Sequence, residues 1–141
     1  MKTFLHPLQN LAEMEAIYTK AKSNRGILEI SGCMESQKAH LIYGLSGLFP
    51  SHLILSEDEK SAKELYEDYR FYDKNVYYYP AKDMLFFQAD IHGNLLIRQR
   101  MRVIKALLEQ KESITVITSV DGCLDYLQPL DKIEKQHAGY G

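Results

Sequence analysis

The sequence predicts an α/β fold in which a parallel sheet is covered by helices. Four short apolar runs alternate with stretches whose apolar residues recur at helical spacing. The runs are ILEI at 27–30, HLIL at 52–55, VYYY at 76–79 and ITVIT at 114–118. Strands that alternate with helices form parallel sheets through right-handed crossovers, and continuous apolar runs are typical of strands covered on both faces.

Helices are expected before, between and after these strands. Pro7 opens the first helix, because proline suits a first turn, where an amide hydrogen would have no partner. The second helix is expected over about residues 36–48, before Pro50. The third follows Ser56 and Glu59, whose spacing matches a capping box.

The fourth helix is expected over about residues 94–110, and the fifth begins with Ser119 as its cap and ends at Pro129. The fourth helix carries an apolar stripe that is expected to face the core. The members of this stripe are Ile97, Met101, Ile104 and Leu108.

The same pattern divides the chain into three parts. Residues 1–25 are expected to form an N-terminal helix, and residues 26–130 the α/β domain. Residues 131–141 are interpreted as a tail or as the start of a linker to a further domain. Because four strands make a small core for this fold class, we interpret the chain as a partial domain of a longer protein.

Composition argues against several classes of function. The net charge of -2 gives no support for a general nucleic-acid binder. Cys33 and Cys123 stand alone without ligand spacing, which favours two buried thiols over a metal site. No run approaches the roughly 18 apolar residues of a membrane span and no leader pattern is visible, so a cytoplasmic location is expected.

Residues 31–47 (SGCMESQKAHLIYGLSG) stand where a phosphate-binding loop would stand, after the first expected strand. The pattern of such a loop is G-x-x-x-x-G-K-[ST]. Gly32 and Lys38 are in register with it, but Gln37 replaces the second glycine and Ala39 replaces the hydroxyl residue.

Each departure from the pattern has a chemical consequence. Gln37 crowds the phosphate position and adopts unusual backbone angles less readily than glycine. Ala39 offers no oxygen to magnesium, and Glu35 places a carboxylate beside the expected anion. Because Lys38 alone does not replace these groups, we expect a degenerate loop that holds neither nucleotide nor metal.

The second half of the chain carries three features in a fixed order. An aromatic strand ends at Tyr79-Pro80, a helix follows the pattern R-x4-K-A-x-L-E, and a last strand ends at Ser119-Val120. The helix pattern is met by Arg100, Lys105, Ala106, Leu108 and Glu109. In this order and spacing, the features resemble the N-terminal region of bacterial transcription-repair coupling factors (Mfd). That region is itself similar to the first domain of the excision-repair protein UvrB.

The resemblance covers about residues 26–127 and implies a RecA-like fold, of the kind found in P-loop NTPases, with a degenerate phosphate loop. It implies that the full-length protein is an ATP-dependent DNA translocase that removes stalled RNA polymerase at lesions and recruits UvrA. ATP and magnesium would then be used by a motor outside this segment, and the segment itself would have no catalytic residue, cofactor or metal. UvrA would be contacted mainly through a domain inserted after the last helix of this chain.

Three cations and two aromatic residues are candidates for partner contact. Arg98, Arg102 and Lys105 fall on one helical face, where they either meet DNA phosphates or an acidic partner or form a solvated surface. Phe86 and Phe87 lie in a long loop, where core packing with the nearby tyrosines is the alternative to partner binding. Arg100 lies on another face, and we expect it to pair with a carboxylate or to cap a strand-end carbonyl.

The sequence therefore leaves three classes of function open. The leading hypothesis is a non-catalytic interaction module that serves as a scaffold for UvrA recognition and for regulation of its parent motor. The alternative is an active ATP-binding domain of a UvrB-like DNA helicase. A direct DNA binder is the third, and the net charge argues against it.

Overall fold

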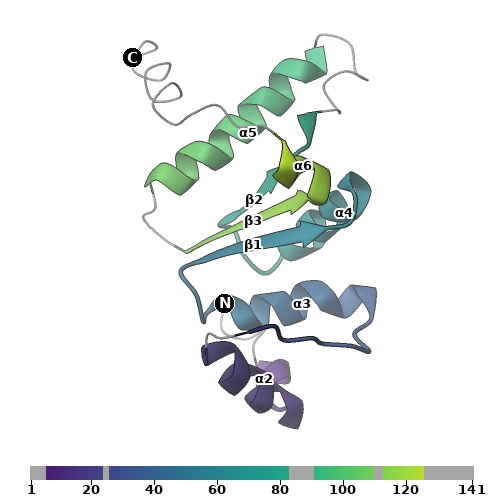
Figure 1. The fold of residues 1–141 in the computed structure, drawn as a ribbon, viewed down its shortest axis with the longest axis vertical. Helices are drawn as coiled ribbons and strands as arrows, with labels where there is room; N and C mark the ends of the chain where they lie inside the picture. Colours follow the sequence, from purple (N-terminus) through teal and green to yellow (C-terminus); the bar gives the residue numbers. More distant parts are fainter. Residues whose placement is uncertain (1–5, 24–25, 83–90, 110–112, 126–141) are drawn as a thin grey trace.

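The computed structural model describes residues 6–23, 26–82, 91–109 and 113–125. Within these ranges the chain is a mixed α/β protein with a three-stranded parallel sheet and helices on both faces of that sheet (Figure 1). No helix in the described ranges is both long and apolar enough to cross a membrane. Phe86, Phe87, Pro129 and residues 131–141 lie outside these ranges.

The sheet is built from three of the four expected strands. They are β1 (Ser51–Ser56), β2 (Val76–Tyr79) and β3 (Ile114–Ser119), in the spatial order β1-β3-β2. Both pairs are parallel, with Ser51 opposite Ile114 and Val76 opposite Thr115. The positions of these strands confirm the sequence prediction to within a residue or two.

The expected first strand does not form. Residues 27–30 have no regular structure, and Ile27 and Ile30 are 95% and 38% exposed. In the view of Figure 1, α3 is drawn between this segment and β1. Apolar composition alone does not supply a partner strand, and no described strand pairs with this run.

Six helices are described. They are α1 (His6–Gln9), α2 (Ala12–Lys22), α3 (Glu35–Ser46), α4 (Glu59–Tyr69), α5 (Ile91–Glu109) and α6 (Val120–Leu124). The N-terminal helix is therefore interrupted, because Leu11 lies in extended backbone between α1 and α2. Asp58 caps α4 through a bond from the Ser61 amide, so the capping box expected at Ser56 is wrong.

Helices cover the two faces of the sheet in different ways. On one face, α4 and α3 pack over Ile117 and Tyr78, with Ala62 and Tyr69 at the centre. On the other face, α5 packs over Val116 and Tyr79 through Val103 and Ile104. The two layers of helices around the sheet produce a three-layer arrangement.

The apolar stripe expected on α5 is only partly buried. Ile104 is buried, but Ile97 and Leu108 are 51% and 47% exposed. The buried line of α5 instead includes Arg100 and Val103. Counting apolar residues alone misplaced the buried face, because an arginine occupies one of its central positions.

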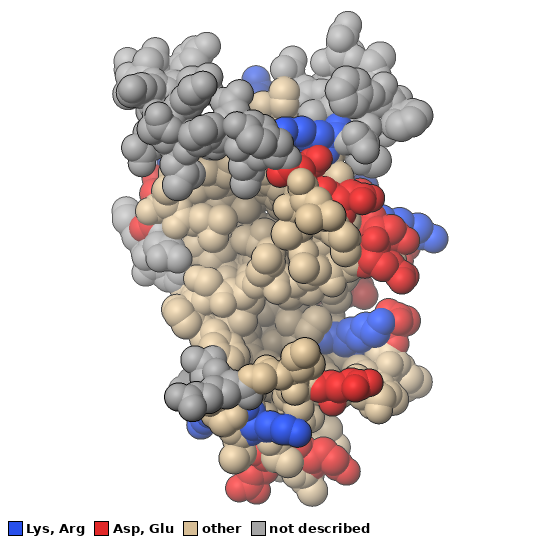
Figure 2. Space-filling view, viewed as in Figure 1, with Lys and Arg blue, Asp and Glu red and all other residues tan. Residues whose placement is uncertain are grey.

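An uncharged surface remains beside α5. Leu53 and Leu55 on β1 share a sheet face with Val116 and are 60% and 52% exposed. Figure 2 shows a broad area over this side of the sheet that carries no lysine, arginine, aspartate or glutamate. The covering layer over β1 is therefore incomplete on this face within the described residues.

The cysteines do not fit the expectation of two buried thiols. Cys33 is half-buried and Cys123 is exposed. Cys33 follows the irregular segment and Cys123 lies on the short α6, so neither belongs to the packed core.

Substitutions at a buried and at an exposed strand residue should differ in their effect on the free energy of unfolding. Ile117 is fully buried in the central strand, so Ile117→Ala should lower the free energy of unfolding by about 2–5 kcal/mol, as for other large-to-small core changes. Leu53→Ala should change it by less than about 1 kcal/mol, because this side chain is mostly solvated. Urea unfolding measures both, and equal effects would contradict the assignment of the faces.

Because the imidazole of His52 is partly buried, we expect the free energy of unfolding to fall in mild acid. Neither ring nitrogen makes a hydrogen bond of normal geometry in the described part of the chain, and burial outweighs the opposing effects of Asp73 and the Ser46 backbone, so the pKa of His52 lies below its ordinary value near 6.5. The unfolded chain therefore takes up a proton at a higher pH than the folded chain. Stability from this group is full above the unfolded pKa and is lost as the pH falls below it.

In urea unfolding, the stability difference between about pH 7.5 and about pH 5 should shrink in His52→Phe. Leu53→Ala, which removes no titrating group from the same strand, is the control and should leave that difference as it is in the wild type. An unchanged pH dependence in His52→Phe would contradict the account.

Candidate functional site at the carboxyl edge of the sheet

The carboxyl ends of parallel strands are the usual ligand-binding edge of an α/β sheet. Here β1 ends at Ser56, β2 at Tyr79 and β3 at Ser119. The first turns of α4 and α6 begin at the same edge, because each helix follows a strand within a few residues. Polar side chains from these segments meet there.

The carboxylate of Glu59 is the centre of this edge. It accepts hydrogen bonds from the hydroxyls of Tyr78 and Ser119 and from the Ala81 amide at 3.0 Å. It thereby joins α4 to the ends of β2 and β3. Burial, with Glu59 beside it, raises the pKa of the Tyr78 hydroxyl.

Ser119 lies against a carboxylate but is not placed for nucleophilic catalysis. Its side chain is fully buried, and its hydroxyl oxygen accepts from the Gly122 amide at 2.9 Å, as the expected cap of α6. A nucleophile has to reach substrate and needs a base that withdraws its proton. Glu59 is engaged by two further donors, so this pair holds structure.

Arg100 ties the segment after β2 to the end of α6. Its guanidinium donates to the Pro80 carbonyl at 2.7 Å and to Asp125 at 2.8 Å, and it lies 4.2 Å from the centre of the Tyr79 ring. Asp125 also accepts from the Lys82 amide at 2.6 Å. Arg100 thus makes both contacts considered from the sequence, a carboxylate pair and a bond to a strand-end carbonyl.

The sequence did not indicate the other members of this network. The spacing of the sequence predicts only a capping role for Glu59, whereas its hydrogen-bond partners lie 19 to 60 residues away in the chain. Asp125 follows α6 in a stretch without a recognisable motif. Contacts over such distances leave no local pattern, so spacing rules could not have found them.

Residues 32–39, which match the phosphate-loop pattern only in part, contact one another through their own side chains. Lys38 pairs with Glu35 at 2.5 Å, and this hydrogen bond raises the pKa of Lys38. The Gln37 side chain accepts from the Met34 amide at 3.4 Å. Ala39 is 2% exposed and packs into the core between α3 and the sheet, so no hydroxyl is present at that position.

Acidic residues do not complete a metal site in the described ranges. No group of three or more metal-binding side chains is found there. Asp121 lies exposed in the first turn of α6, where an acid interacts favourably with the helix dipole.

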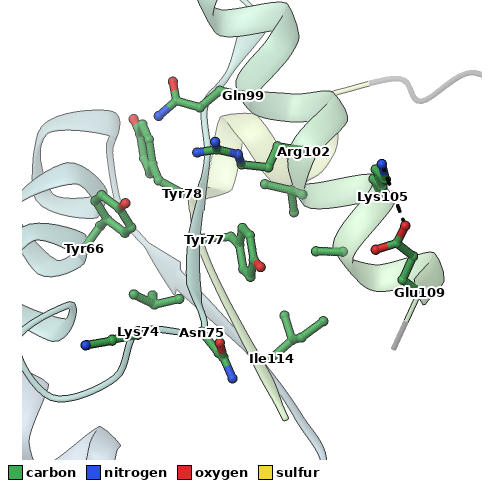
Figure 3. A pocket seen from close by; sticks show the side chains of 13 residues that line it. Tyr66, Lys74, Asn75, Tyr77, Tyr78, Gln99, Arg102, Lys105, Glu109 and Ile114 are labelled. Atoms are coloured by element: carbon green, nitrogen blue, oxygen red, sulfur yellow. Dashed lines mark ion pairs between the residues drawn. The ribbon is translucent and has the colours of Figure 1, made fainter. Parts of the chain in front are cut away.

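Two of the three candidate cations line a groove. Arg102 and Lys105 border a groove of about 630 Å³ along β2, together with Tyr77 and Tyr78 (Figure 3). Arg98 is not among the residues that line it. The structure therefore separates the cationic face expected from the sequence into a groove-lining pair and a solvated residue.

Comparison with protein-family models, curated proteins and solved structures finds no match for this chain.

Because Arg100 makes several buried contacts, we expect its substitution to lower the free energy of unfolding strongly. Arg100→Ala should lower the free energy of unfolding by about 2–4 kcal/mol, near the low end for buried pairs because Asp125 keeps some contact with water. Arg100→Lys should fall between Ala and wild type, since a lysine keeps the charge but not the planar fork. Thermal and urea unfolding measure these changes.

Arg98→Ala on the same helix is the matched control and should leave stability nearly unchanged, because Arg98 is exposed. A melting temperature of Arg100→Ala equal to that of the wild type would contradict the structural role of Arg100.

Proposed function

We propose that this chain is a non-catalytic interaction module, the N-terminal UvrB-homology segment of a bacterial transcription-repair coupling factor. The observation that carries the proposal is the phosphate loop, in which Lys38 pairs with Glu35 while Gln37 and Ala39 replace the two residues that nucleotide binding needs. The family assignment rests on the resemblance of residues 26–127.

The arrangement of the described elements is compatible with a RecA-like layout, and we assign that fold as part of the proposal. A parallel sheet between two layers of helices is shared by many folds with unrelated functions. The degenerate loop before α3 and the sequence pattern around Arg100 support the narrower assignment.

Three obstacles to nucleotide binding differ in weight. The Lys38–Glu35 pair is exposed, so water weakens it and an incoming phosphate could displace Glu35. The loss at Ala39 is more severe, because a buried methyl group has no oxygen for magnesium. Residues 27–30, which would have to hold the loop as a strand, do not pair with the sheet.

In the proposed parent protein, the module is a scaffold for UvrA recognition and for regulation of the motor. The translocase would use ATP and magnesium elsewhere in the chain, and DNA and RNA polymerase would be partners of the full-length protein. The carboxyl edge fits a scaffold, because Glu59 and Arg100 are engaged in bonds that join the elements of this domain.

One observation favours the alternative, an active ATP-binding domain of a UvrB-like helicase. Gly32 keeps a positive φ of 79°, and no atom of a described residue other than its two chain neighbours lies within 4 Å of the place where a side chain would begin. The first glycine of the phosphate-loop pattern therefore retains both its backbone angle and its open space.

A binding titration separates the two candidates. With a fluorescent ATP analogue and magnesium, the chain should show no saturable binding up to about 1 mM, where binding is worth only about 4 kcal/mol. Lys38→Ala should give the same trace as the wild type. Saturable micromolar binding that is lost in Lys38→Ala would contradict the proposal and favour the helicase domain.

The gene tests the family assignment separately. The coding sequence after Gly141 should encode a further domain and then helicase motifs. A stop codon directly after Gly141 would contradict the assignment to a coupling factor.

A further inference from the structure

The outer edge of β2 is an open strand edge in the described part of the protein. β2 pairs only with β3, and the Thr115 amide donates to the Asn75 carbonyl at 3.0 Å. Successive residues of a parallel strand direct their backbone groups to opposite sides. The backbone groups of Tyr77 therefore face β3, as the Asn75 carbonyl does. The amides and carbonyls of Val76 and Tyr78 then face outward, and no described residue bonds to them.

The groove along this edge, here called the β2 groove, has one wall from each helix layer. Tyr66 of α4 forms one wall, and Gln99 and Arg102 of α5 form the other (Figure 3). Its volume of about 630 Å³ lies inside the range of about 300–1,000 Å³ typical of ligand sites. The four residues of β2 span about 13 Å, the length of a short added strand.

The charge of the β2 groove is opposite to that of the whole chain. Lys74, Arg102 and Lys105 line it, with Glu109 as the only lining acid among the described residues. Glu109 pairs with Lys105 at 3.8 Å, whereas no described carboxylate lies within ion-pair distance of Arg102 or Lys74. A local excess of cations on a chain of net charge -2 favours an acidic ligand.

We propose that the β2 groove binds an extended acidic peptide segment of another protein, which adds to the sheet as a strand beside β2. The outward amides and carbonyls supply backbone hydrogen bonds, as in other cases of strand addition. This inference does not depend on the family assignment, since it rests on the edge, the groove and its charge.

The sheet geometry specifies the pattern of side chains in the peptide. Tyr77 points toward α5, while Val76 and Tyr78 share the sheet face that α4 covers. Side chains of an added strand alternate in the same way. Acidic residues therefore meet Arg102 and Lys105 on the α5 side, and apolar residues between them meet Tyr66 on the α4 side.

Other occupants fit the groove less well. Bases of single-stranded DNA need open aromatic faces, but Tyr78 is 8% exposed and its ring lies 5.8 Å from the ring of Tyr66. A second copy of this chain, paired through β2, would bring two sets of Lys74 and Arg102 together, and like charges repel.

The probe for the test is a fluorescent peptide of alternating glutamate and valine, four repeats long, measured by fluorescence anisotropy. The wild type should bind it at micromolar concentration, more weakly as salt rises. A matched peptide of alternating lysine and valine should bind at least tenfold more weakly. No binding of the acidic peptide up to about 1 mM, or equal binding of the two peptides, overturns the proposal.

Two variants locate the site. Arg102→Glu should weaken binding of the acidic peptide at least tenfold, whereas Arg98→Glu, the same change one turn earlier on α5 and outside the groove, should change it less than threefold. Equal effects of the two variants overturn the proposal. Thermal unfolding of both variants checks that each one is folded before binding is compared.

Two further measurements test the strand geometry. An acidic peptide with alternate backbone amides methylated should lose at least tenfold in affinity, because methylation removes donors to β2 without changing this protein. Unchanged affinity overturns the strand model. A single-stranded oligonucleotide that binds more tightly than the acidic peptide, and that loses binding in Arg102→Glu, also overturns it in favour of a nucleic-acid site.

Discussion

The hydrogen bonds to the carboxylate of Glu59 are the contact on which the carboxyl edge of the sheet depends. Donors from the ends of β2 and β3 converge on this one side chain, and it belongs to the first turn of a helix that follows β1. One carboxylate therefore joins the ends of β2 and β3 to each other and to α4, the helix that follows β1. An unpaired charge at this place would be costly, because the groups around it are buried.

Arg100 completes the same edge from the other face. It bonds the Pro80 carbonyl and Asp125, and Asp125 in turn receives the Lys82 amide. Together with Glu59, these bonds engage polar groups at the edge where α/β proteins usually bind ligands, while Nη2 of Arg100 and the Tyr79 hydroxyl are buried without a hydrogen-bond partner among the described residues. The bonds described at this edge hold the elements of the domain together. The β2 groove is a different surface, where no described carboxylate pairs with Arg102 or Lys74 and the outward backbone groups of β2 have no described partner.

Local patterns in the sequence predicted most elements of the fold, and contacts between distant residues explain the remainder. The runs at β1, β2 and β3 and the cap at Ser119 were visible because each depends on a few neighbouring residues. Residues 27–30 are also a short apolar run, but they pair with no described strand. A short run does not indicate by itself whether a partner strand lies beside it. The buried face of α5 was misplaced because Arg100 is buried by its pairing with Asp125, 25 residues later.

Some features of the candidate site could be predicted from the sequence, and others required the structure. Gln37 and Ala39 depart from the phosphate-loop pattern in the sequence alone, whereas the roles of Glu59 and Asp125 follow only from three-dimensional contacts. Arg102 and Arg98 belong to one helical face in the sequence, and only the position of β2 distinguishes them.

The proposed function depends most on residues 32–39, which we interpret as a degenerate phosphate loop that is closed by its own side chains. A crystal structure of the chain grown with millimolar ATP and magnesium tests this claim most directly. The account predicts that the N-terminus of α3 holds no triphosphate, with Lys38 still on Glu35 and Ala39 still in the core. An ordered triphosphate at that helix, with Lys38 turned toward its phosphates, would contradict it.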